Sequence, residues 1–231
     1  MNYNTGINWD LFKNQVDLIH NDKPIFIKNL LPNPERYVTK KEIEKALNQY
    51  QVQWNIIGKD GSEIEIPEYW NAWHGYPIQD KSFIHNKIKE GCTFIINKYR
   101  IHNNFTQTLC LEIEKNFHGI QNDLHVYGGF GDKMSSFDPH FDNHSVMIFQ
   151  VIGECPWIVY NNQQSTLISS NPAINPSKLT PYIEVNMTPG DFLYIPERWI
   201  HFASPKEERI SITVSCPQNK GNGWDKNYYK L

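Results

Sequence analysis

The sequence lacks the features that mark membrane-spanning, secreted and nucleic-acid-binding proteins. No apolar run approaches the roughly 20 residues that cross a bilayer, and the polar start, residues 1–4, does not resemble a signal peptide. The formal net charge is −3, and no run of basic residues stands out. Such a charge does not favour tight nonspecific binding to nucleic acid, which depends on Lys and Arg neutralising phosphates. We therefore expect a cytoplasmic protein without a membrane or nucleic-acid partner.

Cysteine is scarce and widely spaced. The four cysteines are Cys92, Cys110, Cys155 and Cys216, and no two of them form a Cys-x-x-Cys pair. This spacing disfavours a zinc–thiolate site, because such sites usually use closely paired cysteines. Three of the four lie in apolar stretches, which is typical of buried thiols. We expect free, buried thiols.

Aromatic side chains, in contrast, make up 13% of the residues. This composition disfavours long disordered stretches, and 231 residues suffice for one well-buried core. No internal repeat or low-complexity tract stands out. We predict a single α+β domain with a mainly β core over residues 1–231. Its parts are a mostly helical and irregular N-terminal part (1–120), a β-rich part (121–217) and a loose tail (218–231).

The first half carries helix signals separated by short strands. Thr39-Lys-Lys-Glu42 is a capping-box pattern, and apolar residues follow it at helical spacing. Further helices are predicted over 81–90 and 106–118, and strands over 23–27 and 92–96. The aromatic segment 53–75 is expected to form a loop.

From Leu124 onwards, short β-type runs alternate with clusters of Gly, Pro, Asn and Ser. The predicted strands are 125–127, 145–151, 157–160, 182–185, 191–195 and 209–215. Many short strands separated by such turns suit a small barrel or sandwich. The polar, proline-rich segment 161–181 is expected to form a long loop over the barrel mouth.

Two short segments carry the candidate chemistry. His140 and Asp142 form a His-x-Asp pair, and side chains two residues apart on an extended strand lie on the same face. Further along, a predicted turn and strand lead through Pro196 to His201. Two histidines and one carboxylate can hold non-haem Fe(II) and leave positions open for oxygen and an organic ligand. A His-x-Asp pair alone recurs by chance, but its context together with His201 favours the iron site.

The run from His140 to Trp157, with Gly153 between them, resembles the metal-binding strand and turn of the JmjC-type, cupin-fold 2-oxoglutarate oxygenases. It is most similar to the ribosomal-oxygenase branch, and the likeness extends over about residues 84–216. The resemblance implies a double-stranded β-helix, that is a jelly-roll barrel, with helices of the N-terminal half packed outside. It also implies Fe(II), 2-oxoglutarate as cosubstrate and O2.

The same resemblance implies roles for three residues. His140, Asp142 and His201 would be the metal ligands and the catalytic centre. The carboxylate of Asp142 suits hydroxylation, because related halogenases carry a small residue at this position.

One position departs from the family pattern. A basic residue usually lies two positions after the conserved glycine and pairs with the distal carboxylate of 2-oxoglutarate, but here that residue is Cys155. Arg209 is the candidate substitute, together with Ser211, which lies on the same face of a predicted strand; an Arg-x-Ser pair on a late strand resembles the carboxylate clamp of other 2-oxoglutarate oxygenase branches. Tyr127 is a second candidate through its hydroxyl. Alternatively, Arg209 is a solvated residue that ends the charged loop 204–208, and Tyr127 packs in the core.

Taken together, these features predict an Fe(II)/2-oxoglutarate-dependent dioxygenase that hydroxylates a C–H bond. The substrate would be a protein or peptide side chain, an amino acid or another small metabolite. Because of Cys155, an alternative is a metal-dependent cupin oxygenase that does not use 2-oxoglutarate. A non-catalytic metal-binding cupin module is a further alternative, and the complete triad argues against it.

Overall fold

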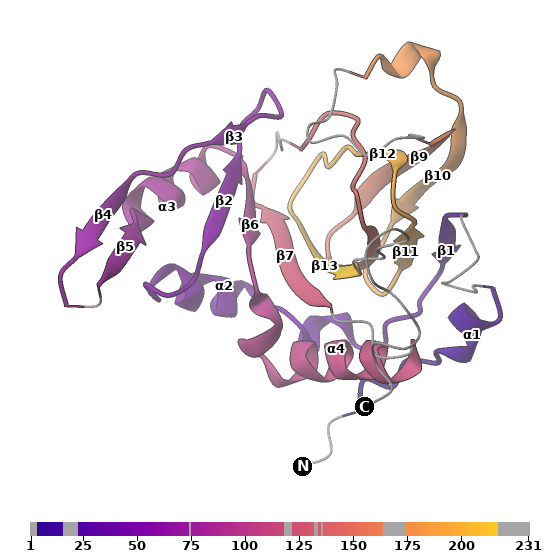
Figure 1. Cartoon of the computed structure of the whole chain (residues 1–231), viewed down its shortest axis with the longest axis horizontal. Coiled ribbons are helices and arrows are strands. Elements are labelled where there is room, and N and C mark those ends of the chain that lie inside the picture. The colour runs from indigo at the N-terminus through magenta and orange to yellow at the C-terminus, as the bar shows by residue number, and fades with distance from the viewer. Residues whose placement is uncertain are drawn as a thin grey trace.

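Two antiparallel β-sheets form the centre of the computed structural model (Figure 1), which describes residues 4–15, 23–73, 75–117, 122–131, 134, 136–163 and 174–216. The large sheet has eight strands, in the spatial order β1 (Ile25–Ile27), β11 (Phe192–Ile195), β8 (Ser145–Ile152), β13 (Arg209–Cys216), β7 (Asp123–Gly129), β6 (Thr93–Ile96), β2 (Trp54–Ile57) and β3 (Glu63–Ile64). The small sheet has three strands, in the order β10 (Pro181–Met187), β9 (Cys155–Gln163) and β12 (Trp199–Ala203).

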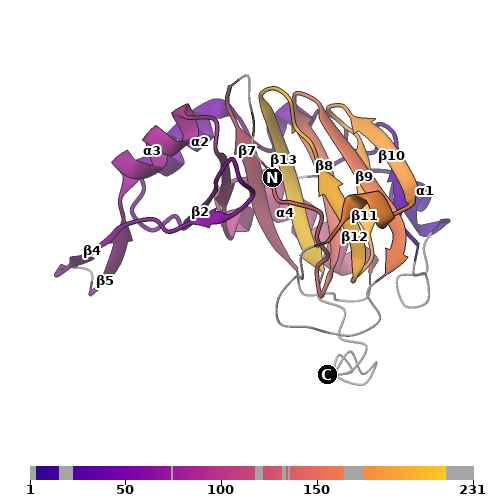
Figure 2. The ribbon, with the colours of Figure 1, turned by 90° about the horizontal axis from the view of Figure 1, so that it is seen from above.

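The two sheets share an apolar interior. One buried cluster takes side chains from β8 and β11 of the large sheet and from all three strands of the small sheet: Val146, Ile148, Val159, Met187, Leu193, Ile195 and Trp199. In Figure 2 the strands β7, β13, β8, β9 and β10 are grouped in one part of the molecule, while β2, β4 (Glu68–Asn71) and β5 (Tyr76–Gln79) extend away from them. The predicted α+β fold with a mainly β core is confirmed.

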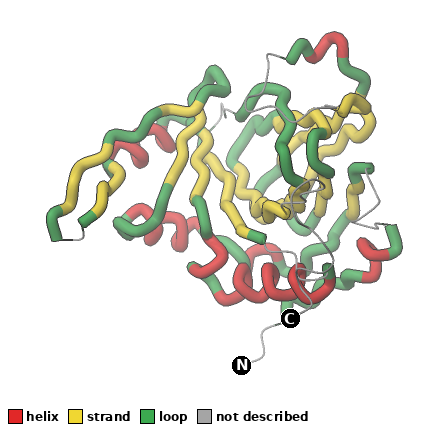
Figure 3. The backbone as a smooth tube through the Cα atoms, viewed as in Figure 1, coloured by secondary structure: helices red, strands yellow, loops and turns green. Residues whose placement is uncertain are grey.

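The helices cover the face of the large sheet that points away from this interior (Figure 3). They are α1 (Asp10–Lys13), α2 (Lys40–Leu47), α3 (Lys81–Lys89) and α4 (Asn104–Asn116), with single 3-10 turns at Pro34–Arg36, Tyr99–Ile101 and Pro176–Lys178. Leu109 and Ile113 of α4 belong to the same buried cluster as Ile212 and Val214 of β13. Alternation along β13 therefore points its apolar side chains to the helices and its polar ones to the barrel interior.

Side-chain caps fix where the helices begin. The Thr39 side chain accepts a hydrogen bond from the Glu42 backbone N–H, and the Glu42 carboxylate accepts one from the Thr39 N–H, which confirms the predicted capping box. Asp80 caps α3 at its predicted start. Asn103 caps α4, so this helix begins before the predicted residue 106.

The expectation of a loop over residues 53–75 is wrong. This segment contains β2, β3 and β4, and it leads into β5. Trp54–Ile57 pairs with Thr93–Ile96, which extends the large sheet with strands from the N-terminal half. The strand signal was obscured because exposed aromatic and acidic residues dominate the segment, although Glu63-Ile64-Glu65-Ile66 does alternate as a strand should. The description of residues 1–120 as mostly helical and irregular was accordingly incomplete.

The structure also bears on several smaller predictions. The predicted loop 161–181 is shorter than expected, because β9 continues to Gln163 and β10 begins at Pro181; residues 164–173 lie outside the described part. The tail 218–231 also lies outside it. All four cysteines are free and buried, as predicted. Among the described residues, no helix is long and apolar enough to cross a membrane. The division into a single domain stays a prediction.

Candidate metal centre and its pocket

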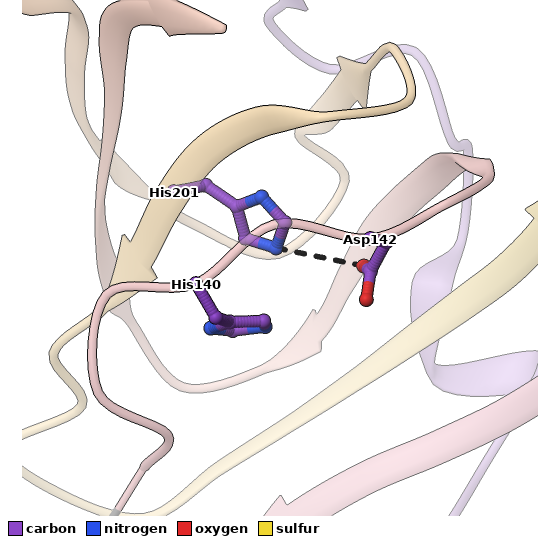
Figure 4. A group of neighbouring side chains, drawn as sticks. All are labelled: His140, Asp142 and His201. Carbon is purple, nitrogen blue, oxygen red and sulfur yellow. Dashed lines mark ion pairs between the residues drawn. The ribbon is translucent and has the colours of Figure 1, made fainter. Parts of the chain in front are cut away.

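His140, Asp142 and His201 come together at the junction of the two sheets (Figure 4). One ligand atom from each of the three side chains lies within 4.8 Å of the others. The rings of His140 and His201 have centroids 4.4 Å apart, and His201 Nε2 lies 3.6 Å from Asp142 Oδ2. The structure thus brings together the three predicted ligands, which the sequence separates widely.

Backbone hydrogen bonds hold the two ligand segments in register. The His140 N–H donates to the His201 carbonyl at 3.1 Å, and the His201 N–H donates to the His140 carbonyl at 2.8 Å. The Arg198 N–H donates to the Asp142 carbonyl at 2.6 Å. The segment of His140 and Asp142 therefore lies against β12, the strand that carries His201. Arg198 adopts a left-handed conformation with φ of 65° to make this turn.

Both histidines are oriented by backbone carbonyls. His140 Nδ1 lies 2.8 Å from the Asp138 carbonyl oxygen, and His201 Nδ1 lies 2.9 Å from the Trp199 carbonyl oxygen. Because a carbonyl only accepts, each Nδ1 must carry the proton, and each Nε2 keeps a lone pair for a metal. Burial, together with the nearby His140, lowers the pKa of His201 to about 4. His201 is therefore neutral near pH 7, as metal coordination requires.

This donor set fits a divalent iron. Two neutral imidazoles and one carboxylate on the same side are the facial triad of non-haem Fe(II) oxygenases, and oxygen–nitrogen ligation without thiolates disfavours a structural zinc site. The described residues contain no other group of three His, Cys, Asp or Glu side chains placed to hold a metal.

The triad opens into a pocket of about 990 Å³. The polar face of the large sheet forms one wall, and β12 and β9 form another. The polar side chains that line it are Asn55, Asn97, His125, Tyr127, Ser136, Asp138, His140, Asp142, His144, His201, Arg209, Ser211, Thr213 and Ser215. All six residues predicted for the metal and the cosubstrate are in this set.

Arg209 is buried, with only 3% of its surface exposed. The interpretation of Arg209 as a solvated loop residue is therefore wrong. Within the described part of the chain, no carboxylate lies within ion-pair distance of Arg209, and its Nε has no hydrogen-bond partner. A buried guanidinium without a partner is costly, so this end of the pocket favours an anionic ligand.

Arg209 also lies close to the position at which the family usually has its basic residue. Burial raises the pKa of the Cys155 thiol, and the charge of Arg209 opposes that rise. The charge of Arg209 can act on Cys155 because Gly153, with φ of 66°, turns the chain directly against the Glu208–Arg209 backbone. The positive charge near Cys155 thus comes from β13 instead of from β9.

Tyr127 and Ser211 are neighbours across the β7–β13 pair. Burial and the charge of Asp142 raise the pKa of Tyr127, so its hydroxyl stays protonated and can donate. The Ser211 hydroxyl donates to Gln150 Oε1 at 2.7 Å, and the Gln150 amide donates to the carbonyls of Ile152 and Gly153. Ser211 therefore has its proton engaged, and it positions the turn rather than offering a free donor.

A polar chain on the sheet was not foreseen. His125 Nδ1 lies 3.1 Å from Asn97 Oδ1, the Asn97 amide donates to Asn55 Oδ1, and the Asn55 amide donates to the Glu63 carboxylate. Asn55 and Asn97 went unrecognised because strand pairing between β2, β6 and β7 brings them together, and the sequence carries no signal for that pairing.

Comparison with known proteins agrees with this geometry. Residues 97–222 match the family model of the JmjC domain. The bifunctional lysine-specific demethylase and histidyl-hydroxylase NO66 of Dictyostelium discoideum is 28% identical over 205 residues, covering 82% of this chain and 37% of the relative. Ribosomal oxygenase 1 of Gallus gallus is 33% identical over 96 residues, covering 38% of this chain and 15% of the relative. The chain thus spans well under half the length of these curated relatives.

Among solved structures, the Escherichia coli ribosomal oxygenase YcfD in complex with cobalt and 2-oxoglutarate superposes with a TM-score of 0.64 at 18% identity, covering 93% of this chain and 53% of YcfD. That likeness shows a shared fold, the JmjC cupin barrel. Since the family model covers more than half of the sequence, the chain belongs to the JmjC domain family.

Proposed function

We propose that this chain is an Fe(II)- and 2-oxoglutarate-dependent dioxygenase that hydroxylates a C–H bond. The observation that carries the proposal is one pocket with the His140–Asp142–His201 triad on one wall and the buried Arg209 on another, whose Nε has no hydrogen-bond partner among the described residues. A bidentate ligand of iron with a second, distal carboxylate would satisfy both. A complex of E. coli YcfD with cobalt and 2-oxoglutarate supports this choice of cosubstrate.

In this proposal the protein's residues bind, orient and shield. His140, Asp142 and His201 would hold the metal through two Nε2 atoms and one carboxylate oxygen. Arg209 would pair with the distal carboxylate, and Tyr127 would donate its hydroxyl to the same ligand. When bound, iron with 2-oxoglutarate and O2 supplies the oxidant, and the balanced outcome is R–H + O2 + 2-oxoglutarate → R–OH + CO2 + succinate.

We further propose that the substrate is a side chain in a protein or peptide, with an amino acid or small metabolite as the alternative. The names of the relatives, histidyl-hydroxylase NO66 and ribosomal oxygenase, support a protein substrate. Asp142 supports hydroxylation over halogenation, because its carboxylate takes the coordination position that a halide needs. The four free cysteines suit a reducing compartment, so we propose a cytoplasmic location.

A second candidate, a cupin oxygenase that does not use 2-oxoglutarate, is favoured by Cys155 at the usual position of the basic residue. Succinate formation separates the two candidates. Purified protein incubated with Fe(II), O2 and 2-oxoglutarate should form succinate, detected by NMR, and Asp142→Ala should abolish it. A protein that binds Fe(II) but neither binds nor consumes 2-oxoglutarate would support the second candidate. Absence of metal binding would contradict both.

A further inference from the structure

A second groove lies beside the metal pocket, at the end of the large sheet. It measures about 700 Å³ and is lined by Trp54, Asn55, Gln79 and residues 63–68. Asn55 lines this groove and the metal pocket alike. The two spaces are therefore neighbours that share one side-chain wall.

The polar chain described above runs from the groove to the pocket. It begins at Glu63 in the groove, passes through Asn55 and Asn97, and ends at His125 in the pocket. Because Asn55 both donates to Glu63 and accepts from Asn97, its amide orientation is fixed from both sides. A continuous chain of side-chain hydrogen bonds thus connects the groove with the metal pocket.

The groove is acidic and has no internal counter-charge. Glu63, Glu65 and Glu68 line it and are exposed, and no Lys or Arg lines it. Among the described residues, none of the three carboxylates forms an ion pair. This charge repels phosphate groups and favours a cationic partner.

The β4–β5 hairpin, which projects from the barrel (Figures 1 and 2), carries exposed aromatic side chains next to the groove residue Glu68 in sequence. Glu68 and Trp70 are two residues apart on β4 and so lie on one face, together with their partners Gln79 and Pro77. Trp70 is 66% exposed, and Trp73 near the hairpin tip is 94% exposed. We refer to Glu63, Glu65, Glu68 and Trp70 as the acidic–aromatic face.

The sheet geometry favours an extended chain as the occupant. β3 is the terminal strand of the large sheet, and a terminal strand presents backbone groups to which a further strand can add. Carboxylates and an indole at alternating positions suit Lys or Arg side chains, through ion pairs and cation–π contacts.

We propose that the acidic–aromatic face docks an extended, basic polypeptide segment, which places a neighbouring residue of that polypeptide in the metal pocket. The inference rests on the proposed hydroxylase function and specifies the flanking chemistry of its substrate. Like charges on two copies of this face disfavour a second copy of the chain as the occupant.

The test measures binding without turnover. Fluorescence anisotropy is recorded with a labelled (Arg-Gly)5 peptide and a matched (Glu-Gly)5 peptide, using wild-type protein without added metal or 2-oxoglutarate. We expect binding of the basic peptide only. Each exposed ion pair contributes up to about fivefold to affinity, so Glu63→Gln/Glu65→Gln/Glu68→Gln should weaken binding by about tenfold or more. Trp70→Ala should weaken it by about two- to fivefold.

The matched control is Glu35→Gln/Glu44→Gln/Glu207→Gln, which removes the same charge from exposed positions outside the groove. Any of three results would overturn the proposal: the control loses as much binding as the groove variant, the groove variant binds the basic peptide as well as the wild type does, or the wild type binds both peptides equally. Analytical ultracentrifugation tests for self-association. If the wild type self-associates and Trp70→Ala abolishes this, the occupant of the face is a second copy of the chain and the proposal is overturned. Succinate formation is measured separately, so failure of the docking proposal is distinguishable from failure of the oxygenase function.

Discussion

At the scale of single residues, the pocket holds a buried guanidinium that no carboxylate of the described chain neutralises. Arg209 lies near Cys155, so the last strand of the large sheet supplies the positive charge that the family usually takes from the position of Cys155. A cation in the same region but from another strand would preserve the electrostatics of carboxylate binding. Arg has the further advantage of a planar fork that matches a carboxylate.

Replacing Arg209 by Ala should weaken 2-oxoglutarate binding by about 10- to 100-fold, because a hydrogen bond to a charged group contributes about 1.5–3 kcal/mol. Calorimetric titration of 2-oxoglutarate into the Mn(II)-loaded protein measures this loss. Arg36→Ala is the control, since Arg36 is exposed and lies over the Phe105 ring.

A rescue variant tests the idea that the cation has changed strands. Cys155→Lys in the Arg209→Ala background should restore much of the affinity, because it returns a positive charge to the same end of the pocket. Cys155→Lys alone should lower stability, since it buries two like charges together. Unchanged 2-oxoglutarate affinity in Arg209→Ala would rule out the assigned role.

Lys81 offers a prediction about pH. Burial lowers the pKa of its amine to about 8 from 10.5. Between these pH values the unfolded chain therefore binds more protons at Lys81 than the folded chain does. The contribution of Lys81 to the free energy of unfolding rises as the pH increases from 8 to 10.5 and falls again as the pH is lowered.

The difference in unfolding free energy between wild type and Lys81→Met, from urea titrations, should shift in favour of the wild type from pH 8 to pH 10. Lys87→Met is the control, because a hydrogen bond with Glu90 raises the pKa of Lys87 and should give no such gain there. If the difference in unfolding free energy between wild type and Lys81→Met did not change with pH, the lowered pKa of Lys81 would be contradicted.

At the scale of elements, the turn between β8 and β9 brings β9 close to the start of β13, which carries Arg209. Gly153 has φ of 66°, and a Cβ at this position would lie 1.9 Å from the Glu208 carbonyl oxygen. The Gln150 amide fastens the same turn through two backbone carbonyls. The close approach of β13 to this turn therefore requires glycine at position 153, and the Gln150 side-chain amide holds the turn in place.

Gly153→Ala should lower the unfolding free energy by about 3 kcal/mol or more, because the strained backbone costs about 1 kcal/mol and the clash adds to it. Gly75→Ala is a matched control, since Gly75 has a similar φ of 69° but no atom within 4 Å of the added Cβ. Urea unfolding of both variants separates the two effects, because Gly75→Ala introduces backbone strain alone, whereas Gly153→Ala adds the steric clash with Glu208. Equal losses in the two variants would mean that the turn relaxes away from β13.

At the scale of the whole molecule, the metal centre joins segments that lie far apart in the sequence. The segment of His140 and Asp142 leads into β8 of the large sheet, while His201 lies on β12 of the small sheet. A metal bound between them would link the two sheets, and it would bind the folded state alone.

Mn(II) should therefore stabilise the protein by about 2.7 kcal/mol at a concentration of 100 times Kd. Thermal unfolding should show this as a rise in Tm of roughly 5–10 °C. Asp142→Ala should remove the rise, whereas the exposed His85→Ala should retain it. A rise that persists in Asp142→Ala would place the metal elsewhere.

The sequence by itself determined the ligand types, the main strands of the barrel and the starts of α2 and α3. These depend on local patterns: alternation along β13, the Thr39–Glu42 cap, and a His-x-Asp pair that lies on one face of any extended chain. Each of these features follows from the spacing of residues that are close together in the sequence.

Only the tertiary structure decided which residues share a pocket. It buried Arg209 beside Cys155, engaged the Ser211 proton with Gln150, and extended the large sheet with strands from residues that had been expected to form a loop. The physical reason is that strand pairing joins residues without regard to their separation in sequence. The acidic–aromatic face and its link to the metal pocket exist only through that pairing.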